Sequence, residues 1–159
     1  MSSDTTTPRP DRRSLSSAAR LYAVQALFQM EAAGQSAERV TREFQNYRID
    51  ADDRDGPTSA ADEDLFARIL DDAVTWQSRI DQATDRALVA RWPIGRIDPV
   101  LRAMFRSAGA ELVAAKAPPK VVISEYVRLT EAFFPDGKEP KFVNAVLDHI
   151  ARELRPEAF

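Results

Sequence analysis

The sequence FARILDDAVTWQSRIDQATDRA, residues 66–87, is the most regular segment of the chain. Apolar residues recur in it at alternating steps of three and four, a spacing that places them on one side of an α-helix. They are Phe66, Ile69, Ala73, Trp76, Ile80, Ala83 and Ala87. The pattern predicts one continuous amphipathic helix, which Pro93 and Gly95 would end.

The segments on both sides of this stretch show the same helical spacing. In LYAVQALF, residues 21–28, only Gln25 is polar, so a helix over residues 15–33 is expected to be buried on nearly all sides and to stop at Gly34. Further helices are expected over residues 36–48, from Asp98-Pro99 to the prolines at 118–119, over residues 119–133, and from the 134–140 connection to Leu154. Because no segment alternates with a period of two, the sequence predicts an all-α fold of about six to seven helices.

The composition fits one soluble domain with a core of its own. The chain has 159 residues, of which 44% are hydrophobic and 30% are charged. Residues 1–14 are polar and lack apolar periodicity, so we expect a disordered basic arm there. The helical segments would then form a single domain over residues 15–156, followed by a tail at 157–159.

The residue inventory excludes several kinds of site and location. There is no cysteine and only one histidine, His149, which rules out disulfides, thiolate zinc sites and multi-histidine metal sites. No apolar run approaches the ~18 residues of a membrane span, and the N-terminus does not resemble a secretory signal. We therefore expect a cytoplasmic protein without membrane contact.

Candidate chemistry is weak along the chain. The acidic stretch DADDRDGPTSAADED, residues 50–64, suggests a calcium loop, but with Gly56 at the sixth position Ala51 occupies the first, where a carboxylate is required. A solvated acidic loop is the better interpretation. Asp148 and His149 are adjacent without a nucleophile or oxyanion site, and glycine-rich phosphate motifs are absent. The sequence therefore predicts a protein that is not an enzyme, with no metal or cofactor.

Charge is distributed unevenly along the chain. Residues 1–20 carry a net charge of +2, residues 50–72 carry -7, and residues 86–159 carry +3, although the whole chain has a net charge of -3. Such polarity suits a protein that contacts nucleic acid with one face only.

The connection FFPDGKEPKF, residues 133–142, adds aromatic side chains and lysines to the basic C-terminal part. Aromatic rings beside cations are what unstacked RNA bases require. Phe133 is in register with the apolar residues before it and is expected in the core. For Phe134 and Phe142, the sequence is equally compatible with stacking on a base and with packing between two helices.

Three stretches together resemble one known family. AVQALFQME, residues 23–31, follows a basic lead-in, and WPIGRIDPVLRAMFRSAGAEL covers residues 92–112. The most specific part is PKVVISEYVRLTEAFF with KEPKFVNAVLDHIAREL, within residues 119–154. In these stretches, and from about Arg12 to Pro156, the chain is similar to the NusB family of bacterial transcription antitermination factors.

The resemblance implies two small helix bundles packed together and a non-catalytic role. Members pair with NusE, the small-subunit ribosomal protein S-ten, and the pair binds the single-stranded boxA element of nascent RNA. Within the RNA polymerase antitermination complex, this promotes read-through of terminators, notably in ribosomal RNA operons. By position, the resemblance implies RNA contacts at Arg9, Arg12, Arg13, Arg20, Phe134, Lys138, Lys141 and Phe142, and partner contacts at Phe28 and Phe142.

The chain departs from the family pattern just before the first helix. Family members often have consecutive arginines there, whereas this chain has Ser14, Ser16, Ser17 and Ala18. Fewer phosphate contacts predict weaker RNA binding. The alternative function is a helical protein-interaction adaptor that makes no direct RNA contact.

Overall fold

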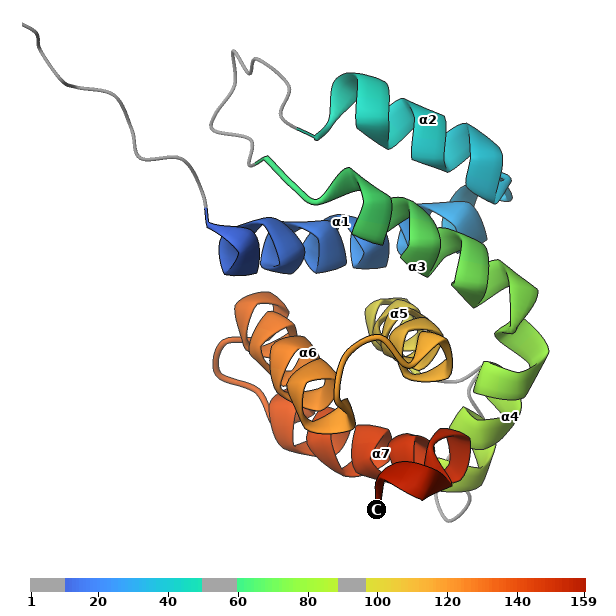
Figure 1. The fold of residues 1–159 in the computed structure, drawn as a ribbon, viewed down its shortest axis with the longest axis vertical. Coiled ribbons are helices and arrows are strands. Elements are labelled where there is room, and N and C mark those ends of the chain that lie inside the picture. Colours follow the sequence, from blue (N-terminus) through green and yellow to red (C-terminus); the bar gives the residue numbers. More distant parts are fainter. Residues whose placement is uncertain (1–10, 50–59, 89–96) are drawn as a thin grey trace, which may run out of the picture.

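The computed structural model describes residues 11–49, 60–88 and 97–159, and within these ranges it contains helices and no strand (Figure 1). The helices are α1 (Arg12–Ala33), α2 (Ala37–Tyr47), α3 (Glu63–Thr75), α4 (Gln77–Ala87), α5 (Pro99–Ala114), α6 (Pro119–Phe133) and α7 (Glu139–Leu154), with a short 3-10 helix at Pro156–Ala158. The predicted all-α fold class is confirmed.

Helix α1 begins three residues earlier than the sequence predicted. Asp11 caps it, because its carboxylate accepts a hydrogen bond of 2.8 Å from the backbone N–H of Ser14. Residues 12–14 are thus helical, while residues 1–10 of the expected arm lie outside the described residues. At the other end the predicted stop is confirmed, since Gly34 closes the helix with φ of 65°, a conformation that favours glycine.

The single helix predicted over residues 66–87 is wrong: the structure has two helices that meet at Trp76. Neither glycine nor proline causes the break. It follows from tertiary packing, because the two helices pack against different partners. The apolar side chains of α3 pack toward α1 and α5, whereas those of α4 pack toward α5 and α7. The two halves of one apolar stripe therefore cover different parts of the molecule, and Trp76 between them is exposed.

Helix α5 is the centre of the fold. Figure 1 shows it nearly end-on, between α1 on one side and α7 on the other. It packs against α1 and α3 and also against α4, α6 and α7. Helix α5 therefore connects the helices before it in the chain with those after it. Gly109 allows α4 to approach closely, because a Cβ there would lie 2.4 Å from Cγ2 of Ile80.

Among the helices of the described ranges, none is long and apolar enough to cross a membrane.

Candidate binding surfaces on helix α1

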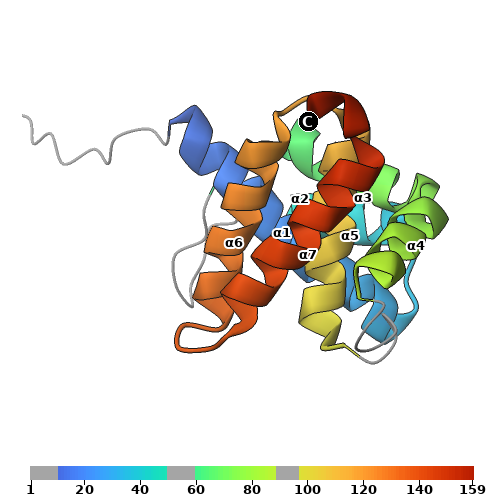
Figure 2. The same cartoon turned by 90° about the horizontal axis from the view of Figure 1, so that it is seen from below.

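Helix α1 separates two kinds of candidate residue. Arg12 and Arg13 lie in its first turn, and Phe28 lies near its other end, about 24 Å away at 1.5 Å per residue. In Figure 2 the amino end of α1 and the α6–α7 connection lie at opposite ends of α6. The first turn of α1, with its arginines, thus lies near one end of α6, and the connection lies at the other.

Of the cations expected to contact RNA, Arg12 and Arg13 are exposed. Arg13 has its Nε 3.9 Å from Oε1 of Glu125 on α6, a long ion pair in which the arginine side chain is largely exposed. Arg9 lies outside the described residues. The first turn of α1 can therefore present two guanidinium groups to a ligand.

Arg20, by contrast, lies inside the molecule and is only 6% exposed. Its Nε and Nη2 donate hydrogen bonds of 2.8 and 3.0 Å to the carboxylate of Glu111 on α5. Burial alone would lower the pKa of Arg20, but the hydrogen bond and the charge of Glu111 raise it. Because its guanidinium is already bound to a carboxylate, we leave Arg20 out of the proposed RNA contacts.

A tyrosine completes this buried cluster. The hydroxyl of Tyr126 donates a hydrogen bond of 2.6 Å to Oε2 of Glu111, and its oxygen lies 2.7 Å from Oγ of Ser107. Burial, followed by the charge of Glu111, raises the pKa of Tyr126 well above its ordinary value. Arg20, Ser107, Glu111 and Tyr126 form what we call the buried cluster, which joins α1, α5 and α6.

The α6–α7 connection carries the other expected RNA contacts. Phe134 and Phe142 are half-buried against the core, and the Phe142 ring packs edge-on against Phe105 with a centroid distance of 6.1 Å. Lys138 and Lys141 are exposed, and neither forms an ion pair with a carboxylate of the described ranges. Each ring thus packs against the core and stays partly exposed, in a connection that also carries two exposed lysines.

An apolar groove of about 420 Å³ surrounds Phe28. The expectation that helix α1 is buried on nearly all sides is wrong, because only six of its 22 residues are buried. Phe28 itself is 39% exposed, which is unusual for a phenylalanine. The groove is lined by Val24, Gln25, Phe28, Gln29, Ala32 and Ala33 of α1, by Phe44 and Arg48 at the end of α2, by Val100 of α5 and by Phe133 of α6. An exposed aromatic ring in an apolar groove is a common anchor for a partner protein.

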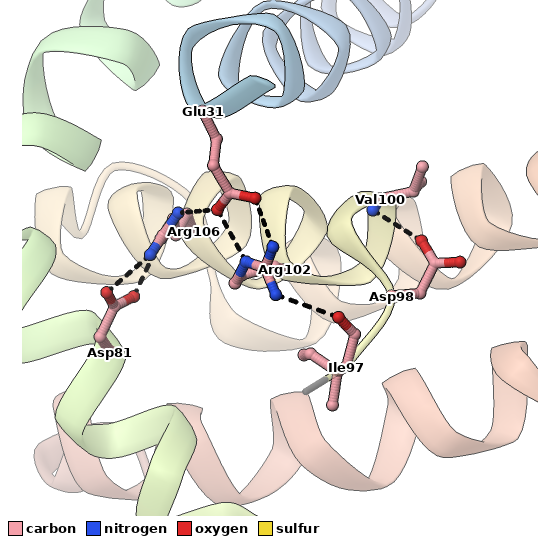
Figure 3. Close-up of polar contacts among 7 residues, drawn as sticks. All are labelled: Glu31, Asp81, Ile97, Asp98, Val100, Arg102 and Arg106. Carbon is pink, nitrogen blue, oxygen red and sulfur yellow. Dashed lines mark hydrogen bonds and ion pairs between the residues drawn. The ribbon is translucent and has the colours of Figure 1, made fainter. Parts of the chain in front are cut away.

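A second ion cluster lies at the carboxyl end of α1, where Glu31 faces two arginines of α5 (Figure 3). Glu31 of α1 accepts hydrogen bonds of 2.7 Å from Nε of Arg102 and 2.9 Å from Nη1 of Arg106, and a further one from Nη2 of Arg102. Arg106 also donates hydrogen bonds of 3.0 and 2.9 Å to Asp81 of α4. The hydrogen bonds from Arg102 hold the pKa of Glu31 below its ordinary value. We call these four residues the rim cluster.

Sequence reasoning missed the rim cluster. Its available signal was the spacing of Arg102 and Arg106, which are four residues apart and therefore on the same side of a helix. Their partners come from α1 and α4, so the spacing indicates a cationic stripe without identifying what it binds.

Metal-ligating side chains do not gather anywhere in the described ranges, which contain no group of three or more that could hold an ion. Most of the acidic stretch considered as a calcium loop, residues 50–59, lies outside those ranges.

Comparison with known proteins gives a consistent assignment. The model of the NusB family matches residues 17–152. The transcription antitermination protein NusB of Maricaulis maris is 43% identical over 153 residues, which are 96% of this chain and 95% of that protein. The protein of the same name from Granulibacter bethesdensis is 44% identical, with 89% of this chain and 90% of that protein covered.

Solved structures agree with these sequence matches. NusB of T. maritima superposes with a TM-score of 0.69 at 27% identity, covering 94% of this chain and 96% of that one. A crystal structure of the antitermination factors NusB and NusE in complex with double-stranded RNA contains a chain that matches with a TM-score of 0.65 at 25% identity, over 86% of this chain and 96% of that one. By its sequence and by its fold, the chain belongs to the NusB family.

Proposed function

We propose that this chain is a non-catalytic antitermination factor that pairs with NusE and, as that pair, binds boxA-type single-stranded RNA. The pair would act in the cytoplasm within the RNA polymerase antitermination complex, notably on ribosomal RNA operons. The observation that carries the proposal is the exposure of Phe28 in an apolar groove, at the end of α1 opposite to the exposed arginines. One helix can thereby serve a protein and a nucleic acid at the same time.

Two surfaces support the RNA part. Arg12 and Arg13 supply cations at the amino end of α1, and the α6–α7 segment supplies two exposed lysines, Lys138 and Lys141, and the partly exposed rings of Phe134 and Phe142. Cations bind phosphate with a strong dependence on salt, whereas aromatic rings stack on bases with little dependence on salt. Arg9 joins this set on its sequence position alone.

The first experiment tests the partner surface. Phe28→Asp places a charge in the apolar groove and is expected to abolish co-elution with NusE in gel filtration, while the far-UV circular dichroism stays unchanged. Tyr47→Asp is the matched control, because Tyr47 is 74% exposed and does not line the groove. A loss of helical signal in Phe28→Asp would mark Phe28 as a core residue and contradict the partner assignment.

A second experiment separates an RNA-binding factor from an adaptor. The chain is titrated with boxA RNA at low and high salt, with and without NusE. RNA binding predicts an affinity that falls with salt, and a salt slope that is smaller by about 0.7 for each phosphate that Arg12→Ala or Arg13→Ala leaves unbound. An adaptor would bind NusE equally well but leave the RNA free.

A further inference from the structure

A second hollow lies beside the amino-terminal half of α1, at the end of the helix opposite to Phe28. It has a volume of about 340 Å³ and lies among α1, the first turns of α3 and the carboxyl end of α5. The elements are held together there, because the N–H of Asp62 donates a hydrogen bond of 3.0 Å to the carbonyl of Leu15. Figure 1 shows α1 and α3 beginning on the same side of the molecule.

Besides the buried Arg20, three cations from three different parts of the chain line this hollow. They are Arg12 of α1, Arg68 of α3 and Lys116, which follows α5. None of these three has a side-chain nitrogen within 4.0 Å of a carboxylate oxygen in the described part of the chain. Their charged groups are therefore available to a ligand.

The carboxylates that line the hollow are mostly engaged elsewhere. Glu111 binds Arg20 and Tyr126, and the carboxylate of Asp62 accepts a hydrogen bond of 3.0 Å from the N–H of Leu65 as the cap of α3.

Asp72 is the remaining carboxylate of the hollow. Burial and the charge of Asp71 raise its pKa, and the charges of Arg68 and Lys116 only partly oppose this rise. With Glu111 paired to Arg20, the remaining charged groups are Arg12, Arg68 and Lys116 against Asp62 and Asp72, so the lining carries a net charge of +1, although the chain as a whole is acidic.

We propose that this hollow holds a phosphate group of the bound RNA, with Arg12, Arg68 and Lys116 as its ligands. Planar guanidinium groups match phosphate oxygens with paired hydrogen bonds, and a lysine adds a compact charge. The inference rests on the RNA binding proposed above and extends the RNA path beyond the first turn of α1, onto α3 and the end of α5. No motif in the sequence indicated Arg68 or Lys116.

The test is the salt dependence of boxA RNA binding by the complex with NusE. The double variant Arg68→Ala/Lys116→Ala is expected to bind more weakly, with a slope of log affinity against log salt that is smaller by about 0.7 for each phosphate left unbound. The matched control is Arg39→Ala/Arg42→Ala, which removes the same charge from two exposed arginines of α2 that do not line the hollow. The control is expected to keep the wild-type slope.

Two variants and one competing ligand make the test decisive. A double variant that folds, as judged by circular dichroism, and keeps the wild-type slope overturns the proposal. Asp72→Asn removes the opposing carboxylate and should tighten RNA binding, so unchanged affinity would also contradict it. A third outcome is that inorganic phosphate raises the melting temperature of wild type, but not of the double variant, more than chloride does at equal ionic strength. If wild type and the double variant then have equal salt slopes for RNA binding, the hollow binds free phosphate and not RNA.

Failure of the hollow and failure of the proposed function give different results. If the wild-type complex with NusE binds no boxA RNA at any salt concentration, the proposed function is wrong. If the wild-type complex binds RNA but Arg68→Ala/Lys116→Ala leaves the salt slope unchanged, the proposed function stands. In that case the hollow does not bind an RNA phosphate.

Discussion

The two ion clusters both join α1 to α5, but with opposite polarity and different burial. In the buried cluster the cation, Arg20, comes from α1 and the anion, Glu111, from α5. In the rim cluster the anion, Glu31, comes from α1 and the cations from α5. Residue 20 of α1 thus pairs with residue 111 of α5, and residue 31 pairs with residue 102, so the two helices run antiparallel. Opposite charges meet only in this orientation and register. A parallel arrangement would bring like charges together.

The difference in burial assigns the clusters different roles. An ion pair removed from water gains little net stability, but losing one partner leaves a charge that neither water nor protein compensates. The rim cluster is only partly buried, with side chains 12–34% exposed, so it keeps access to water and its loss costs less. The buried cluster therefore specifies how the helices meet, while the rim cluster fixes the end of α1 near the groove around Phe28.

The largest effect is expected for Glu111→Gln. This substitution removes the nearest charge that compensates Arg20 and leaves only Glu125, at 4.0 Å. It also replaces one carboxylate oxygen with an amide donor, so a single oxygen cannot serve both Arg20 and Tyr126, and the free energy of unfolding should fall by about 3–5 kcal/mol. Urea denaturation followed by circular dichroism measures it. The double variant Arg20→Met/Glu111→Gln should recover much of the loss, because it no longer buries an unpaired charge. A single variant that loses less than about 1 kcal/mol would mean that the cluster is solvated.

A smaller effect is expected for Glu31→Gln. It weakens charged hydrogen bonds to Arg102 and Arg106, which keep water access and, for Arg106, a second partner in Asp81, so the expected loss in the free energy of unfolding is about 1–3 kcal/mol. The same urea denaturation measures it. A loss as large as that of Glu111→Gln would contradict the proposed difference between the clusters.

Acid provides a second readout of the rim cluster. The pKa of Glu31 is lowered in the folded chain, so the unfolded chain binds the proton more readily and the stabilisation is present above the ordinary glutamate pKa. It is lost as the pH falls through the lower folded value. The difference in stability between wild type and Glu31→Gln should therefore shrink on acidification below about pH 4.3.

Much of the fold was predictable because its signals are local. Gly34 and the Asp98-Pro99 pair mark helix ends through their own backbone preferences, and the structure has the ends there. The break at Trp76 was not predictable, because it depends on where α3 and α4 find their partners. Residue type alone also could not separate Arg20 from Arg12, since the partner of Arg20 lies 91 residues away in the sequence.

The smallest effect is expected where a similar pair lies at the surface. Arg86 of α4 donates hydrogen bonds of 2.8 and 2.5 Å to the carboxylate of Glu153 on α7, with the Arg86 side chain 56% exposed. Arg86→Ala should lower the free energy of unfolding less than either Glu111→Gln or Glu31→Gln does, because water already solvates both groups and salt screens them. The loss should diminish at about 1 M salt, whereas that of Glu111→Gln should persist, since buried charges are screened much less. If Arg86→Ala costs as much as Glu31→Gln and is equally insensitive to salt, burial does not rank these pairs, and the distinction between the two clusters of α1 fails with it.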